Sequence, residues 1–296
     1  MELSKNFVKA KRPCADGFRW FIRNRHAGSD YQQLLDALVR DGRVDDACWL
    51  LDQFGPTDAE LVLDHLDADA LVFAGSVIVR GELRIATTLR AGHAIRAGGG
   101  IHVGHALTAG DGLQSDGAIH CGGVLRAGSG IKAAWGIDVG ADLHGGGDLR
   151  AGWDLCVGGR LVLEGGAQAG QDLRADGAIE CAKGLRAGGD IESQRSIRTG
   201  QGIEAGGSVR SGMHLEAGWG VRATGDIAAA GAIHVGESLQ AEGTISAGPG
   251  YGIYAGVHVQ VEAWHTCAPV RASMRPQALM SGWWDGGGAG SSPALA

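Results

Sequence analysis

Aliphatic residues recur at every sixth position from Leu71 to Ile245. Of the thirty positions sampled in this way, all except Ala167 carry Leu, Ile or Val. A mostly small or apolar residue follows two positions later and glycine often comes next, as in the segment LRAG at 125–128. Alternation with a period of two is typical of a strand whose first and third side chains point inward, and glycine permits a sharp corner. Each hexad therefore predicts a three-residue strand followed by a corner.

The charged side chains between the two inward positions indicate how many hexads close one coil. From Arg174 to Arg222 this outward position alternates between arginine and glutamate at every hexad. Three hexads per coil place unlike charges beside each other in successive coils, whereas two hexads would stack like charges, which destabilises a sheet. We therefore predict a mainly β fold, a three-sided β-solenoid of about ten 18-residue coils over residues 71–250. Stacking of coil on coil would bury its aliphatic core.

The segment before the repeat has the spacing of helices. Ser29 and Asp30 are candidate N-cap residues, and Gly42 is a candidate stop between two apolar runs. We expect residues 1–70 to form a small helical N-terminal domain whose apolar face, which includes two tryptophans, covers the first coil.

The segment after the repeat predicts a second cap. The six-residue period slips after residue 250, and tryptophan and proline become frequent. We expect residues 251–284 to form a C-terminal cap and the sequence DGGGAGSSPALA at 285–296 to form a flexible tail. Because both ends would be covered, few unpaired strand edges would be left for end-to-end assembly. This favours a monomer or a side-to-side oligomer.

Composition and charge narrow the class of protein. The 53 glycines have no three-residue period, which excludes collagen, and the aliphatic content is too high for a disordered linker. A net charge of −7 argues against broad nucleic-acid binding. No apolar run has the length of a signal peptide or of a bilayer span. The six cysteines form no CxxC motif, which is typical of free thiols in a reducing compartment. We expect a cytoplasmic protein without a cofactor.

The hexads also carry family resemblances. The GIxAG hexads resemble those of uncharacterised bacterial β-solenoid proteins, a resemblance that implies no known activity. More distantly, the repeat is similar to bactofilins and other right-handed bacterial solenoids, which implies a right-handed coil and a filament-forming scaffold. In the hexapeptide acyltransferases, which form left-handed helices, the small residue precedes the aliphatic one. Here the order is reversed, as at 125–128, and this separates the chain from that enzyme family.

Three histidines form a candidate metal site. His102 and His120 are separated by three hexads at the outward position, and His105 falls at a nearby corner. Imidazoles bind metals well, but surface histidines at a tolerant position explain the pattern more simply. We therefore assign no metal site.

Three aspartates are expected at one corner of successive coils, at Asp154, Asp172 and Asp190. Stacked carboxylates could hold a cation, yet aspartate at a corner commonly accepts hydrogen bonds from the backbone of its own turn. We favour the role in the turn.

One patch breaks the charge pattern. Lys132 and Arg150 are separated by three hexads and stack two cations, while Trp135 and Trp153 stand at the following corner, where the repeat usually has small residues. Tryptophan and arginine are frequent at binding hot spots, so the patch is a candidate protein-binding site. Alternatively, each basic side chain could lie on its tryptophan in a local cation–π contact.

These patterns favour binding over catalysis. Solenoid enzymes carry active sites on inserted loops or at subunit joints, and the thirty hexads run without an insertion. We predict a non-catalytic module that binds another protein, as a scaffold, an adaptor or a toxin-neutralising partner. Two alternatives stay open, a bactofilin-like polymerising cytoskeletal scaffold and a hexapeptide-repeat transferase or lyase.

Overall fold

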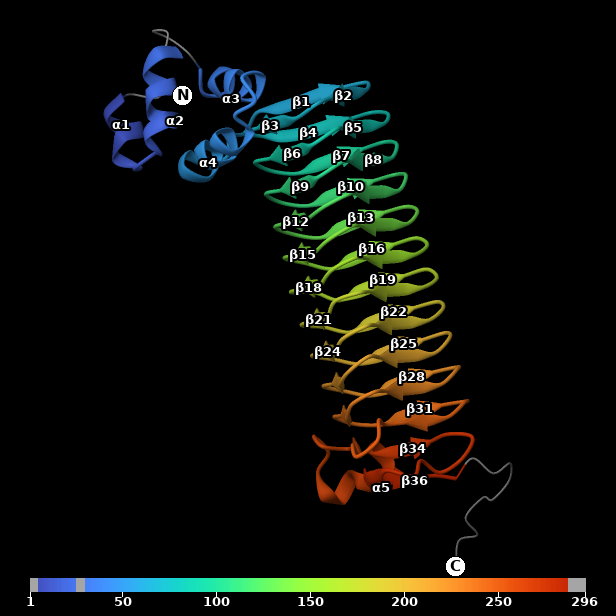
Figure 1. The fold of residues 1–296 in the computed structure, drawn as a ribbon. Helices are drawn as coiled ribbons and strands as arrows, with labels where there is room; N and C mark the ends of the chain where they lie inside the picture. The colour runs from blue at the N-terminus through green and yellow to red at the C-terminus, as the bar shows by residue number, and fades with distance from the viewer. Residues whose placement is uncertain (1–4, 25–29, 287–296) are drawn as a thin grey trace, which may run out of the picture. The chain divides into compact units, whose positions relative to one another are not determined.

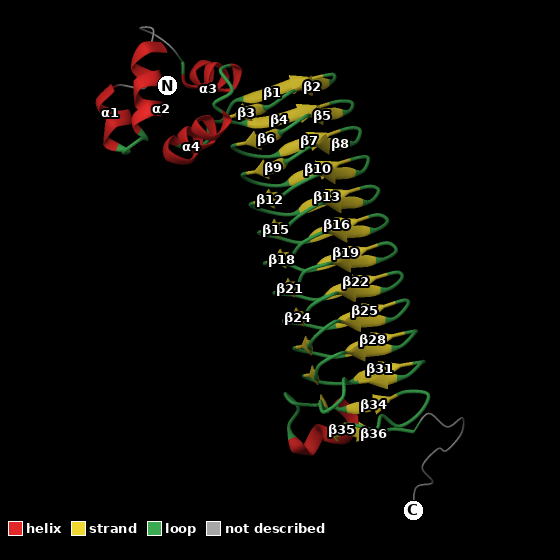
Figure 2. Cartoon of the chain, in the orientation of Figure 1, coloured by secondary structure: helices red, strands yellow, loops and turns green. Residues whose placement is uncertain are grey.

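The computed structural model describes residues 5–24 and 30–286 of the chain. It divides the chain into two compact units, Met1–Ser129 and Gly130–Ala296, and each is described here by itself. Both units are built mainly from short parallel strands, with helices at the start of the first unit and an irregular cap at the end of the second (Figures 1 and 2). No helix in the described ranges is long and apolar enough to cross a bilayer.

The first unit opens with four short helices, α1 (Lys5–Ala10), α2 (Ala15–Asn24), α3 (Tyr31–Arg40) and α4 (Val44–Phe54). Asp30 is the N-cap of α3 and forms a capping box with Gln33, because their side chains bind each other's backbone N–H groups. The helix ends at Arg40 with Asp41 as its C-cap, and Gly42 adopts a positive φ of 71°. Asp30 and Gly42 thus confirm the predicted helix boundaries, whereas Ser29 lies outside the described residues.

Twelve strands follow in the first unit and form three parallel sheets with four strands each. The first sheet contains β1 (Glu60–Leu63), β4 (Ser76–Val79), β7 (Ile95–Ala97) and β10 (Leu113–Ser115). The second contains β2 (Leu66–Ala68), β5 (Leu83–Ile85), β8 (Ile101–Val103) and β11 (Ile119–Cys121). The third contains β3 (Leu71–Phe73), β6 (Thr88–Ala91), β9 (Ala106–Ala109) and β12 (Leu125–Ala127).

The first coil starts before the predicted one. Strands β1 and β2 precede Leu71 and lie inside the range 1–70 that the sequence assigned to the helical domain. Leu61 pairs with Val77 and Leu66 with Leu83, and both offsets are shorter than three full hexads. The aliphatic residues of this coil follow one another in steps of five rather than six, so a six-residue period could not detect them.

The helices pack on this first coil. Val72 and Ala74 of the coil belong to the same buried core as Leu35 and Leu50 of the helices. The side-chain amide of Gln32 donates to the carbonyl oxygen of Val72 at 3.0 Å and accepts from the N–H of Ala74 at 2.9 Å. The amide therefore binds β3 as a neighbouring strand would, on the edge away from β6.

The second unit contains the longer series of coils, whose strands also form three parallel sheets. Sheet 1 consists of β13 (Ile131–Ala133), β16 (Leu149–Ala151), β19 (Ala167–Ala169), β22 (Leu185–Ala187), β25 (Ile203–Ala205), β28 (Val221–Ala223), β31 (Leu239–Ala241), β34 (Pro269–Arg271) and β36 (Trp283–Trp284). Sheet 2 consists of β14 (Ile137–Val139), β17 (Leu155–Val157), β20 (Leu173–Ala175), β23 (Ile191–Ser193), β26 (Val209–Ser211), β29 (Ile227–Ala229) and β32 (Ile245–Ser246). Sheet 3 consists of β15 (Leu143–Gly145), β18 (Leu161–Leu163), β21 (Ile179–Cys181), β24 (Ile197–Thr199), β27 (Leu215–Ala217), β30 (Ile233–Val235), β33 (Ile253–Ala255) and β35 (Leu279–Ser281).

The register confirms three hexads per coil. Arg174 pairs with Glu192 and Arg198 with Glu216, and each partner lies three hexads further along the chain. The Nε of Arg198 lies 2.8 Å from Oε2 of Glu216, so unlike charges meet as the sequence predicted. Inward hydroxyls are also paired, because Oγ of Ser193 donates to the carbonyl oxygen of Gly177 at 2.8 Å. The polar residues of the core therefore tie the corners to the strands.

The C-terminal cap continues two of the sheets. Ile253 of β33 pairs with Ile233, an offset longer than three hexads, because extra residues enlarge the preceding turn. The 3-10 helix η1 (Val261–Ala263) and the helix α5 (Trp264–Cys267) then lead into β34, which pairs with β31. The predicted cap is confirmed. Of the predicted tail at 285–296, Asp285 binds Arg271, and residues 287–296 lie outside the described part of the chain.

Candidate functional site

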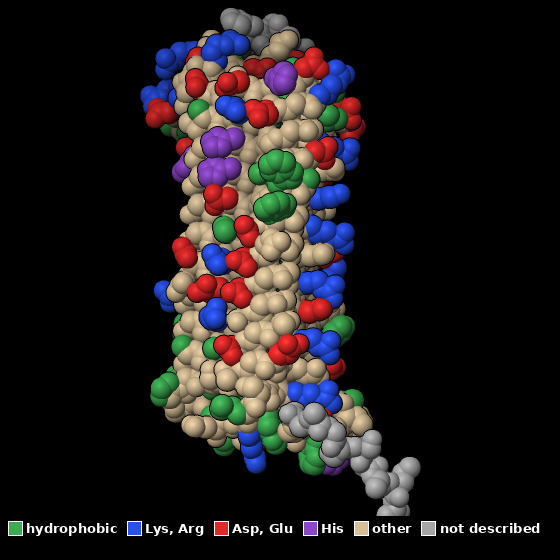
Figure 3. Space-filling view, turned by 90° about the vertical axis from the view of Figure 1, so that its right-hand side faces the viewer, with side chains coloured by type: hydrophobic (Ala, Val, Ile, Leu, Met, Phe, Trp, Pro, Cys, Tyr) green, Lys and Arg blue, Asp and Glu red, His purple; other side chains and the backbone are tan. Residues whose placement is uncertain are grey.

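The two predicted tryptophans lie together on the second unit. Trp135 follows β13 and Trp153 follows β16, at the corner between sheet 1 and sheet 2. The backbone N–H of Trp153 donates to the carbonyl oxygen of Trp135 at 3.4 Å, which stacks the two corners directly. The side chains are 65% and 63% exposed. Figure 3 shows large hydrophobic side chains that protrude from the surface of this face.

The two basic residues of this patch also lie as predicted. Lys132 pairs with Arg150 in adjacent strands of sheet 1, and both side chains are exposed. Neither forms an ion pair with a described acidic residue, although other arginines of the coils do. Because about two thirds of each indole is open to water, the basic side chains leave most of both rings uncovered. Two cations and two aromatic rings are thus exposed side by side.

The three candidate metal ligands lie in the first unit. The rings of His102 and His120 stack with centroids 4.7 Å apart and an interplanar angle of 13°. The ring of His105 is not part of this stack. Its backbone carbonyl oxygen accepts a hydrogen bond from the thiol of Cys121 at 3.7 Å. No group of three or more His, Cys, Asp and Glu side chains within residues 5–24 and 30–286 is arranged to hold a metal ion. The two imidazole rings thus form a stacked pair on adjacent strands.

The corner aspartates have a structural role that differs from the predicted one. Oδ1 of Asp154 accepts from the N–H of Asp172 at 3.1 Å, and Oδ1 of Asp172 accepts from the N–H of Asp190 at 2.9 Å. Each carboxylate thus binds the next coil, and the prediction of a bond within its own turn is wrong. The reason is that corner N–H groups point along the coil axis, toward the side chain of the preceding coil.

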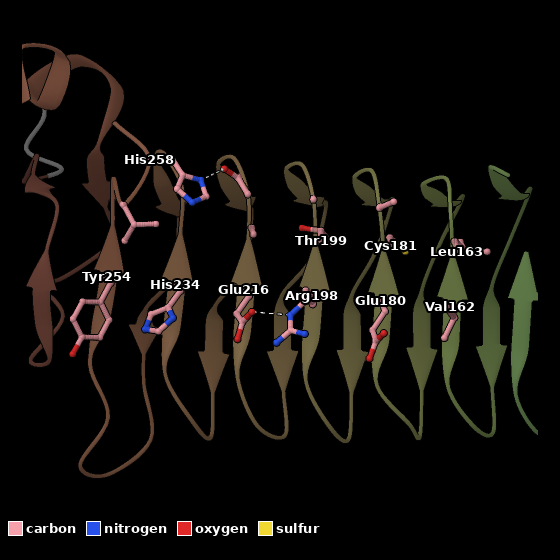
Figure 4. Close-up of a pocket in the computed structure, with 15 residues that line it drawn as sticks. Val162, Leu163, Glu180, Cys181, Arg198, Thr199, Glu216, His234, Tyr254 and His258 are labelled. Carbon is pink, nitrogen blue, oxygen red and sulfur yellow. Dashed lines mark hydrogen bonds and ion pairs between the residues drawn. The ribbon is translucent and has the colours of Figure 1, made fainter. Parts of the chain in front are cut away.

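Sequence reasoning missed a groove on sheet 3 of the second unit. It has a volume of about 770 Å³, and the outward residues of six consecutive strands of the sheet line it (Figure 4). In order they are Val162, Glu180, Arg198, Glu216, His234 and Tyr254. The hydrogen bond from Arg198 lowers the pKa of Glu216. The rings of His234 and Tyr254 meet edge to face with centroids 4.9 Å apart.

The cap and the floor complete this groove. Val257 and His258 come from the cap, and Nδ1 of His258 lies 3.0 Å from the carbonyl oxygen of Gly218 (Figure 4). Cys181 lies at the floor, and burial raises the pKa of its thiol to about 12. The thiol form is therefore the favoured one at neutral pH. The longer offset at Tyr254 hid this row, because a constant step of three hexads does not place Tyr254 beside His234.

The comparisons with known proteins reach only the helical segment. Residues 1–54 match the family model of the YdhT N-terminal domain, and the match ends at the last residue of α4. No curated protein and no solved structure matches the chain.

Proposed function

We propose that the protein is a non-catalytic binding module whose β-coils present a tryptophan patch, Lys132, Trp135, Arg150 and Trp153, to another protein. The observation that carries the proposal is the exposure of both indoles on a rigid, hydrogen-bonded corner. In the next coils the same corner position holds Gln171, and then Gly189. Large aromatic side chains that are already ordered lose little conformational entropy on binding, and tryptophan and arginine dominate binding hot spots.

The remaining faces offer weaker anchors. Most outward arginines of the coils are already paired, as Arg186 is with Glu204 and Arg198 with Glu216. Such exposed pairs contribute about 0–1 kcal/mol and are screened by salt. A partner that replaced them would exchange one weak ion pair for another. The patch is where a partner would gain buried apolar area.

Two further features support a scaffold or adaptor. The hexads of the second unit run from β13 to β32 without an inserted loop that could carry an active site. The helical segment matches a domain family of its own, so the chain joins two different modules.

The test compares partner capture by the intact chain and by the double variant Trp135→Ala with Trp153→Ala. Affinity purification from the native organism, followed by a binding titration with the purified partner, should show a loss above about 2 kcal/mol for the variant. The melting temperature should stay unchanged, because neither indole lies in the core. Met213→Ala serves as control, since this side chain is 42% exposed at another corner. Unchanged affinity together with lowered stability would show that the indoles only pack locally, and the proposal would be wrong.

A further inference from the structure

A second groove of about 600 Å³ runs over sheet 1 of the second unit, beside the corner between sheet 3 and sheet 1. It includes Arg150 of the tryptophan patch and extends across the following coils. Trp219, which is 53% exposed, lines the groove from the corner between sheet 3 and sheet 1. Its other charged residues are Lys183, Arg186, Arg222, Asp148, Glu204 and Glu237.

Sheet 1 is the basic face of the second unit. From β13 to β31 its outward residues include four cations and one acid, a sum of +3, in a chain with a net charge of −7. Asp148 is paired with Lys183, and Glu204 with Arg186. Arg150 and Arg222 have no carboxylate partner among the residues that the structure describes. Their charge is available to an acidic ligand.

A column of glycines lines the corner side of the groove. The residues directly before β19, β22, β25 and β28 are all glycine, at positions 166, 184, 202 and 220. A Cβ on Gly184 would lie 2.8 Å from the carbonyl oxygen of Gly202, and one on Gly202 would lie 2.9 Å from that of Gly220. A side chain at these positions would therefore collide with the backbone of the next coil, and no side chain of the column covers the strands beside it.

The glycine column also leaves backbone donors open. At the corner between sheets 1 and 2, the N–H groups of Asp190 and Ser208 are bound by carboxylates of the preceding coil, at 2.9 and 2.7 Å. In the groove the N–H groups of Gly184, Gly202 and Gly220 have no acceptor within the described chain, because the preceding coil carries a glycine. Half-buried N–H groups in a cationic groove favour an anionic acceptor.

Asp148 shows how a carboxylate fits this groove. Its Oδ1 accepts from the N–H of Gly166 at 3.0 Å and from Nζ of Lys183 at 3.1 Å. The hydrogen bond from the N–H of Gly166 lowers the pKa of Asp148 most, and the hydrogen bond from Lys183 lowers it further. The next coils repeat the same geometry with glycine in place of aspartate. Each offers the donor without the carboxylate.

We propose that this groove binds an acidic, extended segment of the partner protein. Its carboxylates accept from the N–H groups of Gly184 and Gly220, which lie two coils apart, and its other acidic groups pair with Arg150 and Arg222. Neighbouring coils are roughly 4.8 Å apart, so two coils span about 9.6 Å. Three residues of a polyproline II segment span about 9.3 Å. Acidic residues at every third position of such a segment match every second coil.

This inference rests on the proposed function, since the segment belongs to the protein that the tryptophan patch anchors. The probe is a fluorescein-labelled peptide of repeated Glu-Pro-Pro, titrated against the full chain at low ionic strength and followed by polarisation. The control peptide repeats Gln-Pro-Pro. We expect the acidic peptide to bind at least about tenfold more tightly, because charge-assisted hydrogen bonds are roughly twice as strong as neutral ones.

Two variants separate the groove from general charge. Gly202→Asp copies Asp148 and places a carboxylate at the N–H of Gly220, so it should lower the affinity for the acidic peptide about tenfold or more. Ser208→Asp adds the same charge at the equivalent position of the opposite corner and should leave the affinity within about twofold. The double variant Arg150→Gln with Arg222→Gln should also weaken binding about tenfold. Its matched control is Arg174→Gln with Arg210→Gln on sheet 2.

The outcomes are distinct. Equal binding of both peptides, or equal effects of Gly202→Asp and Ser208→Asp in proteins with native thermal melts, would overturn the inference. Tighter binding of an oligonucleotide of similar length would overturn it in favour of a nucleic acid. If Gly202→Asp does not fold, the arginine variants decide the question alone. Loss of partner capture in the tryptophan variant, without any peptide binding, would leave the proposed function intact and reject only the groove.

Discussion

Replacement of Leu173 by alanine tests which side chains hold the coils together. Leu173 is 0% exposed and lies in a column between Leu155 and Ile191 of the neighbouring coils. The strands above and below are fixed by backbone hydrogen bonds, so the cavity cannot close. The free energy of unfolding should therefore fall by about 2–5 kcal/mol. The matched control is Arg174→Ala, the next residue, whose exposed ion pairs with Asp172 and Glu192 contribute about 0–1 kcal/mol.

The assay is urea-induced unfolding followed by circular dichroism, with midpoint and slope fitted for both variants. We expect a large shift of the midpoint for Leu173→Ala and a small one for Arg174→Ala. Equal shifts, or a larger shift for the arginine variant, would refute the inward and outward assignment. A lower slope for Leu173→Ala would show that the coils on the two sides of the cavity unfold separately, as stacked repeats can.

Two further predictions concern pH and assembly. Hydrogen bonds from N–H groups of the next coil lower the pKa of Asp142 and Asp148. These bonds therefore stabilise the folded protein fully above the unfolded pKa of about 3.9, and this contribution is lost as the pH falls through the lower folded pKa. Unfolding free energies measured between neutral and strongly acidic pH should decline in that window, and a flat profile would contradict the bonds. Removal of residues 251–296 uncovers the edges of β30 and β31 and should cause aggregation in sedimentation experiments. A monodisperse truncated chain would show that the cap does not protect these edges.

The repeat could be predicted from the sequence because one residue type at one position was enough to define it. The inward aliphatic residue sets the strand, and the alternation of Arg174, Glu192 and Arg210 sets the number of strands per coil. The first coil was not predicted because its aliphatic residues follow in steps of five, as between Leu61 and Leu66. Strands separated by these shorter steps still pair with the strands of the next coil. A search for a fixed six-residue period cannot detect them.

The tryptophan patch was predicted because it replaces small residues with large ones. The two grooves were not, since no single residue marks them. The groove on sheet 1 depends on side chains that are missing from a column, and its N–H donors are open only because Gly166, Gly184 and Gly202 follow one another in successive coils. The direction in which the Asp172 carboxylate bonds was also hidden, because residue type alone does not tell which coil a corner N–H faces.

The alternating charges limit how such a gene could change in length. Deletion of a single coil, which is three hexads, keeps every aliphatic residue in its column, but Arg174 would then stack on Arg210 instead of Glu192. Deletion or duplication of two coils preserves both the core and the order of charges. Over this part of the chain, evolution by unequal recombination would therefore favour steps of two coils, and a set of related genes should differ by even numbers of repeats.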